Sequence, residues 1–65
     1  LDVKMIKMFE FYTNNPKNLP KKWQSENYLS LSKVKDYKIA EDVCDYIANM
    51  TDSYFELKCE EIKIL

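Results

Sequence analysis

The stretch CDYIANMTD, residues 44–52, decides the fold because it contains the end of one helix and the start of the next. Many helices end in a left-handed residue, for which asparagine is the usual substitute for glycine, and this chain contains no glycine. Asn49 is therefore predicted to end a helix in that conformation. Thr51 has a hydroxyl that suits a helix N-cap, and Asp52 adds negative charge to the helix start. The stretch predicts a sharp corner between two helices, with Met50 as the linking residue.

The segment before this corner has helical spacing from about Tyr37 onward, with Asp36 predicted as its N-cap. On a helical wheel its polar side chains share one arc: Lys38, Glu41, Asp42, Asp45 and Asn49. Lys38 is the predicted ion-pair partner of Glu41 and Asp42, three and four residues away. The apolar side chains of this segment are Tyr37, Ile39, Ala40, Val43, Cys44, Tyr46, Ile47, Ala48 and Met50. They fill an arc of roughly 200°, whereas a helix on the surface of a small domain needs an apolar stripe of about 100°. Neighbours are therefore expected on two sides.

Two more segments are predicted to be helical. The segment after the corner carries apolar residues over more than half of its circumference: Tyr54, Phe55, Leu57, Cys59, Ile62, Ile64 and Leu65. A first helix is predicted over residues 2–14, with an apolar stripe at helical spacing: Leu1, Met5, Met8, Phe9 and Tyr12. It ends before Pro16, because the residue that precedes a proline avoids the helical conformation.

A connection of roughly 20 residues follows this first helix, and it contains both prolines. A short turn is predicted around Trp23. Long unpacked loops are uncommon in compact domains, so the apolar residues of the connection are expected to pack on a neighbouring surface. These residues are Leu19, Trp23, Tyr28, Leu29 and Leu31. The predicted fold class is all-α, with two or three helices and a long proline-containing connection, and residues 1–65 form a single helical segment. Its broad apolar faces and its start at Leu1 predict a fragment of a larger helical fold.

Composition narrows the function. The chain has 65 residues and a net charge of −1, from 10 basic and 11 acidic residues. This balance disfavours nucleic-acid binding, although Lys17, Lys21 and Lys22 flank Trp23, because such binding needs an excess of clustered cations. A solvated basic loop anchored by Trp23 is the simpler interpretation. There is no long apolar run that could cross a membrane and no signal peptide, so a cytoplasmic location is expected. Cys44 and Cys59 are predicted to be buried thiols.

The sequence also resembles a known family. VCDYIANMTDSYFEL, residues 43–57, is similar to the VxDYIAGMTDRYAL stretch near the C-terminus of the deoxyguanosinetriphosphate triphosphohydrolase family. This family is the dNTPase branch of the HD-domain metalloenzymes. The upstream FEFYTNNPKNLPKKW, residues 9–23, is similar to the family's aromatic helix and NPxxLP loop. Asn49 replaces a glycine of the family pattern, and Ser53 replaces an arginine, which removes a cation.

The resemblance implies a parent protein that hydrolyses a dNTP to the deoxynucleoside and tripolyphosphate. Such enzymes hold a divalent metal with a histidine, a His-Asp pair and a further aspartate, and this chain has no histidine. The resemblance therefore implies that this chain is the C-terminal helical part of such an enzyme. It is expected to carry no catalytic or metal-binding residue and no cofactor of its own. Its expected partners are the rest of the parent protein or other subunits, and dNTP is the parent's substrate. Six positions carry the family motif as structural or interface residues: Asp45, Tyr46, Asn49, Thr51, Asp52 and Tyr54.

Asp45, Asp52 and Glu56 could form an acid–base pair only if two carboxyl groups faced one cleft, and a solvated face is the simpler interpretation. Tyr46 and Tyr54 could meet a substrate, but core or interface packing is favoured. Two alternatives to the hydrolase fragment stay open: a stand-alone helical protein-interaction module and, less favoured, a nucleic-acid binder that uses Trp23.

Overall fold

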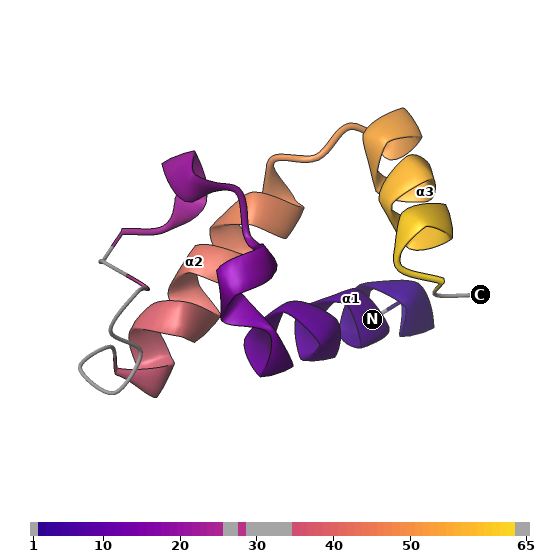
Figure 1. The fold of residues 1–65 in the computed structure, drawn as a ribbon. Coiled ribbons are helices and arrows are strands. Elements are labelled where there is room, and N and C mark those ends of the chain that lie inside the picture. The colour runs from indigo at the N-terminus through magenta and orange to yellow at the C-terminus, as the bar shows by residue number, and fades with distance from the viewer. Residues whose placement is uncertain (1, 26–27, 29–34, 64–65) are drawn as a thin grey trace.

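A computed structural model describes residues 2–25, 28 and 35–63 of the chain. Every regular element in these residues is helical, which confirms the all-α class. The elements are α1 (Val3–Asn14), the 3₁₀ turns η1 (Pro16–Asn18) and η2 (Lys21–Trp23), α2 (Asp36–Ala48) and α3 (Asp52–Glu61). Figure 1 shows α1 packed against α2, while α3 lies beyond the end of α2 and beside the start of α1.

The first helix ends at Asn14, as predicted, and begins at Val3, one residue later than predicted. The carboxylate of Asp2 accepts a hydrogen bond of 2.9 Å from the backbone N–H of Lys4 and caps the helix start. At the other end, the side-chain amide of Asn15 donates to the carbonyl of Phe11 at 2.9 Å, and Pro16 follows. The predicted turn at Trp23 is also confirmed, as η2.

The predicted N-cap of α2 is wrong by one residue. Asp36 is already the first residue of the helix, and Lys35 takes the cap position without a side-chain cap bond. The carbonyl of Lys35 accepts from the backbone N–H groups of Lys38 and Ile39 at 3.0 and 3.2 Å. With helical backbone angles, Asp36 contributes its negative charge to the first turn and no cap bond.

The corner between α2 and α3, residues 49–51, lies where the sequence predicted it. Thr51 caps α3, because its hydroxyl oxygen accepts from the backbone N–H of Tyr54 at 3.1 Å. The conformation predicted for Asn49 is wrong: φ is −96° and ψ is 5°. Among the described residues, positive φ at a non-glycine residue occurs at Lys63 alone. The amide of Asn49 instead donates to the carbonyl of Asp45 at 2.7 Å, so the side chain caps the helix and the backbone need not turn left-handed.

The hydrophobic core draws on every helix and on the connection. Its buried members are Met8, Tyr12, Leu19, Tyr28, Ile39, Val43, Tyr46, Ile47 and Cys59. Leu19 and Tyr28 thus pack as predicted, and Trp23 lies partly buried against this core. Leu29 and Leu31, which carry the same prediction, lie outside the described residues. Cys59 is the single buried residue of α3, so this helix is held mainly at one edge.

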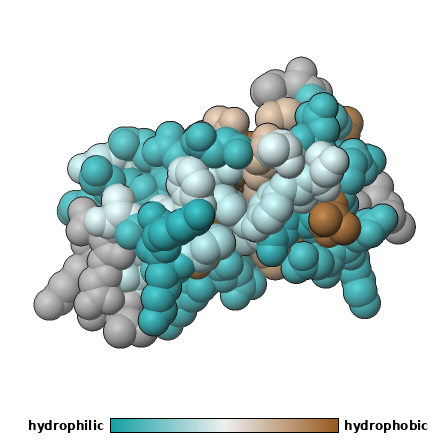
Figure 2. Space-filling view, turned by 90° about the horizontal axis from the view of Figure 1, so that it is seen from above, coloured by the Kyte–Doolittle hydropathy of each residue, from teal (hydrophilic) through white to brown (hydrophobic). Residues whose placement is uncertain are grey.

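The broad apolar faces are only half covered. Tyr37 is 61% exposed and Leu57 is 59% exposed, and Val3 and Ile6 also face outward. Most of the face in Figure 2 is hydrophilic, with hydrophobic atoms at a few separate places. Cys44 is exposed, so its predicted burial is wrong, whereas the burial of Cys59 is confirmed. Cys44 belongs to the apolar arc of α2, but the described residues leave its side chain exposed. No helix among the described residues is long and apolar enough to cross a membrane.

Candidate functional site

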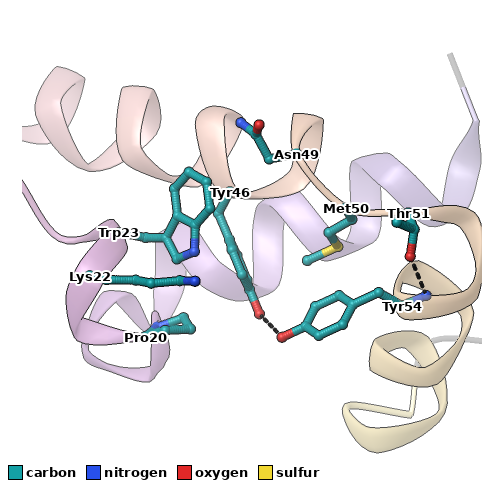
Figure 3. Close-up of a pocket in the computed structure, with 8 residues that line it drawn as sticks. All are labelled: Pro20, Lys22, Trp23, Tyr46, Asn49, Met50, Thr51 and Tyr54. Carbon is teal, nitrogen blue, oxygen red and sulfur yellow. Dashed lines mark hydrogen bonds between the residues drawn. The ribbon is translucent and has the colours of Figure 1, made fainter.

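The corner borders a hollow of about 340 Å³ that brings most of the motif residues together. It is lined by Pro20, Lys22, Trp23, Tyr46, Asn49, Met50, Thr51 and Tyr54. In Figure 3 the hydroxyls of Tyr46 and Tyr54 point toward each other, with the η2 residues on one side and Met50 and Thr51 on the other. Four of the six motif residues therefore line one hollow. Asp45 and Asp52 are exposed and do not line it.

Tyr46 is the centre of an aromatic cluster. Its hydroxyl lies 2.9 Å from that of Tyr54, and its ring meets the rings of Tyr12 and Trp23 at centroid distances of 5.4 and 5.7 Å. The edge-to-face contact with Tyr12 is the arrangement that aromatic quadrupoles favour. Burial, reinforced by the hydrogen bond to Tyr54, raises the pKa of Tyr46 well above its ordinary value. Tyr46 therefore joins α2 to α3 through its buried ring and its hydrogen bond to Tyr54.

Two lysines lie over the rings of this cluster. The ammonium of Lys22 is 5.8 Å from the centroid of Trp23, and that of Lys58 is 5.7 Å from the centroid of Tyr54. Lys58 also donates to Glu61 at 3.2 Å. Burial lowers the pKa of Lys58, but the hydrogen bond to Glu61 and the neighbouring tyrosines outweigh it, so the pKa is raised. These contacts cover the aromatic faces with positive charge.

Asp42 is the structural residue that the sequence interpretation missed. It is only 5% exposed, and its Oδ2 accepts from the backbone N–H and hydroxyl of Ser25, each at 2.9 Å, and from the hydroxyl of Tyr28 at 2.5 Å. Burial acts to raise the pKa of Asp42, but these hydrogen bonds and the charge of Lys38 together lower it. A single carboxylate thus fastens the long connection to α2.

The wheel placed Asp42 in the polar arc and paired it with Lys38, and that placement is wrong. The ion pairs among the described residues are Lys4–Glu56 and Lys58–Glu61, so Lys38 acts on Asp42 only at longer range. One signal could have indicated burial: Asp42 lies three residues after Ile39 and four before Tyr46, which are both buried on the same side of the helix.

Of the three carboxylates considered for acid–base chemistry, Asp52 and Glu56 line one hollow near the start of α3, whereas Asp45 does not line it. Asp45 and Asp52 are exposed, and Glu56 lies 3.4 Å from the ammonium of Lys4. Ser53, which replaces the family's arginine, is also exposed and does not line the hollow at the corner. In the part of the chain that the structure describes, no three histidine, cysteine, aspartate or glutamate side chains are grouped to hold a metal ion. The divalent metal that the resemblance implies therefore does not fit these residues.

Comparison with known proteins places the chain in a family. A family model described as the phosphohydrolase-associated domain matches residues 4–61, which include all three helices except the first residue of α1. Neither the comparison with curated proteins nor that with solved structures gave a match. The matched range contains the corner, the aromatic cluster and the buried Asp42. Because the match extends over nearly the whole sequence, the chain belongs to the phosphohydrolase-associated domain family.

Proposed function

We propose that this chain is the C-terminal helical part of a dNTP triphosphohydrolase-like protein, which it supports without carrying the reaction. The match of residues 4–61 to a phosphohydrolase-associated domain is the observation that carries this proposal. The likeness of residues 43–57 to the dNTPase motif narrows it to one reaction class. The parent protein would convert a dNTP and water to a deoxynucleoside and tripolyphosphate.

The geometry supports a structural role. Asn49 caps the end of α2 and Thr51 caps the start of α3, while the Tyr46–Tyr54 hydrogen bond joins the two helices. The corner therefore has a defined shape that does not depend on a bound group. The packing of the three helices leaves apolar side chains exposed on each of them, for example Val3, Tyr37 and Leu57. Exposed apolar surface of this kind suits a domain that packs against more protein.

The metal chemistry would belong to the rest of the parent. The chain has no histidine, and its described residues hold no group of metal ligands. When bound, a divalent metal supplies Lewis-acid activation of a phosphate ester or of water. What this chain contributes is a rigid packing surface for the part that holds the metal.

The test uses the intact protein that contains this chain, purified with divalent metal and given each of the four dNTPs. Release of tripolyphosphate is expected from the intact protein and not from the 65-residue chain alone. Tyr46→Ala should lower both the melting temperature and the activity of the intact protein, whereas Glu60→Gln, at an exposed position, should leave both unchanged. Absence of tripolyphosphate with every dNTP, or activity from the isolated chain, would contradict the proposal.

A stand-alone interaction module is the second candidate. The observation that favours it is the shared core, to which three helices and the connection all contribute buried side chains. Size-exclusion chromatography and thermal melting of the 65-residue chain separate the two candidates. A chain that is as stable alone as within the intact protein favours the module, and a chain that melts cooperatively but at a lower temperature alone favours the hydrolase part.

A further inference from the structure

An apolar groove lies between α1 and α2. Its lining comprises Met5, Ile6, Phe9, Cys44, Ile47 and Ala48, and its volume is about 290 Å³. Met5, Ile6, Cys44 and Ala48 are exposed in the chain as described. None of the six side chains carries a charge. The groove is therefore apolar surface that water contacts unless another segment covers it.

This groove continues toward the start of α3. A second hollow, of about 310 Å³, shares three lining residues with the groove, namely Met5, Ile47 and Ala48. Its other lining residues are Asp2, Met50, Asp52, Phe55 and Glu56. The two hollows thus adjoin each other, and together they are called the channel, which is apolar between α1 and α2 and carries carboxylates near α3. An apolar groove between helices is the type of surface that accepts the apolar side of an amphipathic helix.

The margin of this channel is acidic. Asp2, Asp52 and Glu56 line its α3 end, and Lys4 lies 3.4 Å from Glu56. On α2, Glu41 precedes Cys44 by three residues and Asp45 precedes Ala48 by three, so each exposed carboxylate neighbours a residue that lines the groove. Among the described residues that line the two hollows, none is a lysine or an arginine. A partner with cations beside its apolar stripe would therefore be electrostatically matched.

We propose that this channel docks an amphipathic helix of the phosphohydrolase, with an apolar stripe flanked by lysine or arginine. The source of that helix rests on the proposed function, whereas its chemistry follows from the channel alone. A second copy of this chain fits less well, because a two-fold symmetric interface uses the same surface patch on both subunits. Two acidic margins would then face each other, which opposes association.

The exposed thiol of Cys44 gives a direct measure of occupancy. The probe is a synthetic helical peptide with a leucine stripe flanked by lysines, and its control has glutamates in the lysine positions. Each is added to the 65-residue chain, and alkylation of Cys44 by a neutral maleimide is followed by mass spectrometry. The buried Cys59 is the internal reference. The lysine peptide should slow alkylation of Cys44 by about tenfold or more, and the glutamate peptide should have little effect.

Three variants locate the effect. Ala48→Arg adds bulk and positive charge in the groove and should abolish protection, while an arginine at the end of α2 is compatible with the helix. Leu57→Arg is the matched control, because Leu57 is exposed but lines neither hollow. It should leave protection intact. The double variant Glu41→Lys/Asp45→Lys should weaken protection by the lysine peptide. Melting curves confirm that each variant is folded.

Three results would overturn the proposal: equal protection by both peptides, unchanged protection in Ala48→Arg, or protection of Cys44 that rises with the concentration of the chain alone. The last result would assign the channel to a second copy. None of these readouts depends on dNTP hydrolysis, so their failure leaves the proposed reaction untouched. Conversely, charge-selective protection combined with an intact protein that releases no tripolyphosphate would contradict the proposed function alone.

Discussion

The hydroxyl oxygens of Tyr46, on α2, and Tyr54, on α3, lie 2.9 Å apart, so a hydrogen bond joins the two helices across the corner. Cys59 is the one buried side chain of α3, while Phe55 and the C-cap residue Ile62 pack partly buried against the core. Tyr46 is 3% exposed and also packs on Tyr12 and Trp23. The bond therefore connects α3 to a buried aromatic residue of the core.

Loss of this bond should be measurable. Tyr46→Phe keeps the ring contacts and removes the hydroxyl, so we expect a loss of about 1 kcal/mol in the free energy of unfolding. For a chain of this size that corresponds to a fall of roughly 4–8 °C in melting temperature. Tyr46→Ala also removes the ring and should cost about 3–5 kcal/mol. The matched control is Tyr37→Phe, at an exposed position, which should change stability by less than about 0.5 kcal/mol.

Asn49 separates two explanations of the corner. Its side-chain amide donates to the carbonyl of Asp45, and its φ of −96° gives no advantage to glycine. Asn49→Gly and Asn49→Ala should therefore both destabilise the chain by about 1 kcal/mol in urea denaturation. Asn49→Asp should cost more, because it replaces the donor with negative charge at a helix C-terminus. A neutral or stabilising Asn49→Gly would show that backbone conformation, not the amide bond, determines the corner.

Features that depend on neighbours in sequence could be predicted. Thr51 and its hydrogen-bond partner Tyr54 are three residues apart, and Pro16 lies two residues after the end of the first helix. The cap and the helix end could therefore both be predicted from neighbouring residues. Asp42 could not, because its partners Ser25 and Tyr28 are 17 and 14 residues away. The wheel placed Asp42 in the polar arc, whereas Asp42 is buried because the connection passes over that side of α2.

The exposure of Cys44 could not be predicted either, because it also depends on contacts between segments distant in the sequence. The wheel correctly assigned it to an apolar arc, but that arc is wider than the rest of the chain can cover. Ile47 and Cys44 both line the groove beside α1, yet Ile47 is buried and Cys44 is exposed, which the wheel could not distinguish. The hollow at the corner could likewise be predicted only in part. The sequence placed Tyr46 and Tyr54 on the two helices that meet at the corner. It did not predict that Trp23, from the distant connection, packs on the ring of Tyr46.

Asp42 should make stability depend on pH in acid. Hydrogen bonds from Ser25 and Tyr28 lower its pKa despite burial, so the unfolded chain binds this proton more tightly than the folded chain. The stabilisation is complete above the unfolded carboxyl pKa of about 3.9 and is lost as the pH falls through the lower folded pKa. Asp42→Asn should reduce the free energy of unfolding by about 1–3 kcal/mol at pH 7 and flatten this acid dependence.

The control for this pH dependence is Asp45→Asn, because Asp45 lies on the same helix but is exposed. Urea denaturation of each variant between pH 2 and pH 7 gives the comparison. Asp45→Asn should retain the acid slope of the unmodified chain. If Asp42→Asn retained it as well, the carboxylate of Asp42 would not be the group whose protonation loosens the connection.

The two cysteines should react at very different rates. Cys44 is exposed in the α1–α2 groove, whereas Cys59 is 2% exposed, and burial, with the nearby charge of Glu56, raises the pKa of its thiol. Because the thiolate is the reactive form, Cys59 should react slowly while the chain is folded. With excess Ellman's reagent at pH 8, we expect one fast equivalent in buffer and two in denaturant. Cys44→Ser should remove the fast equivalent and Cys59→Ser should leave it, whereas two fast equivalents in buffer would show that α3 does not stay packed on the core.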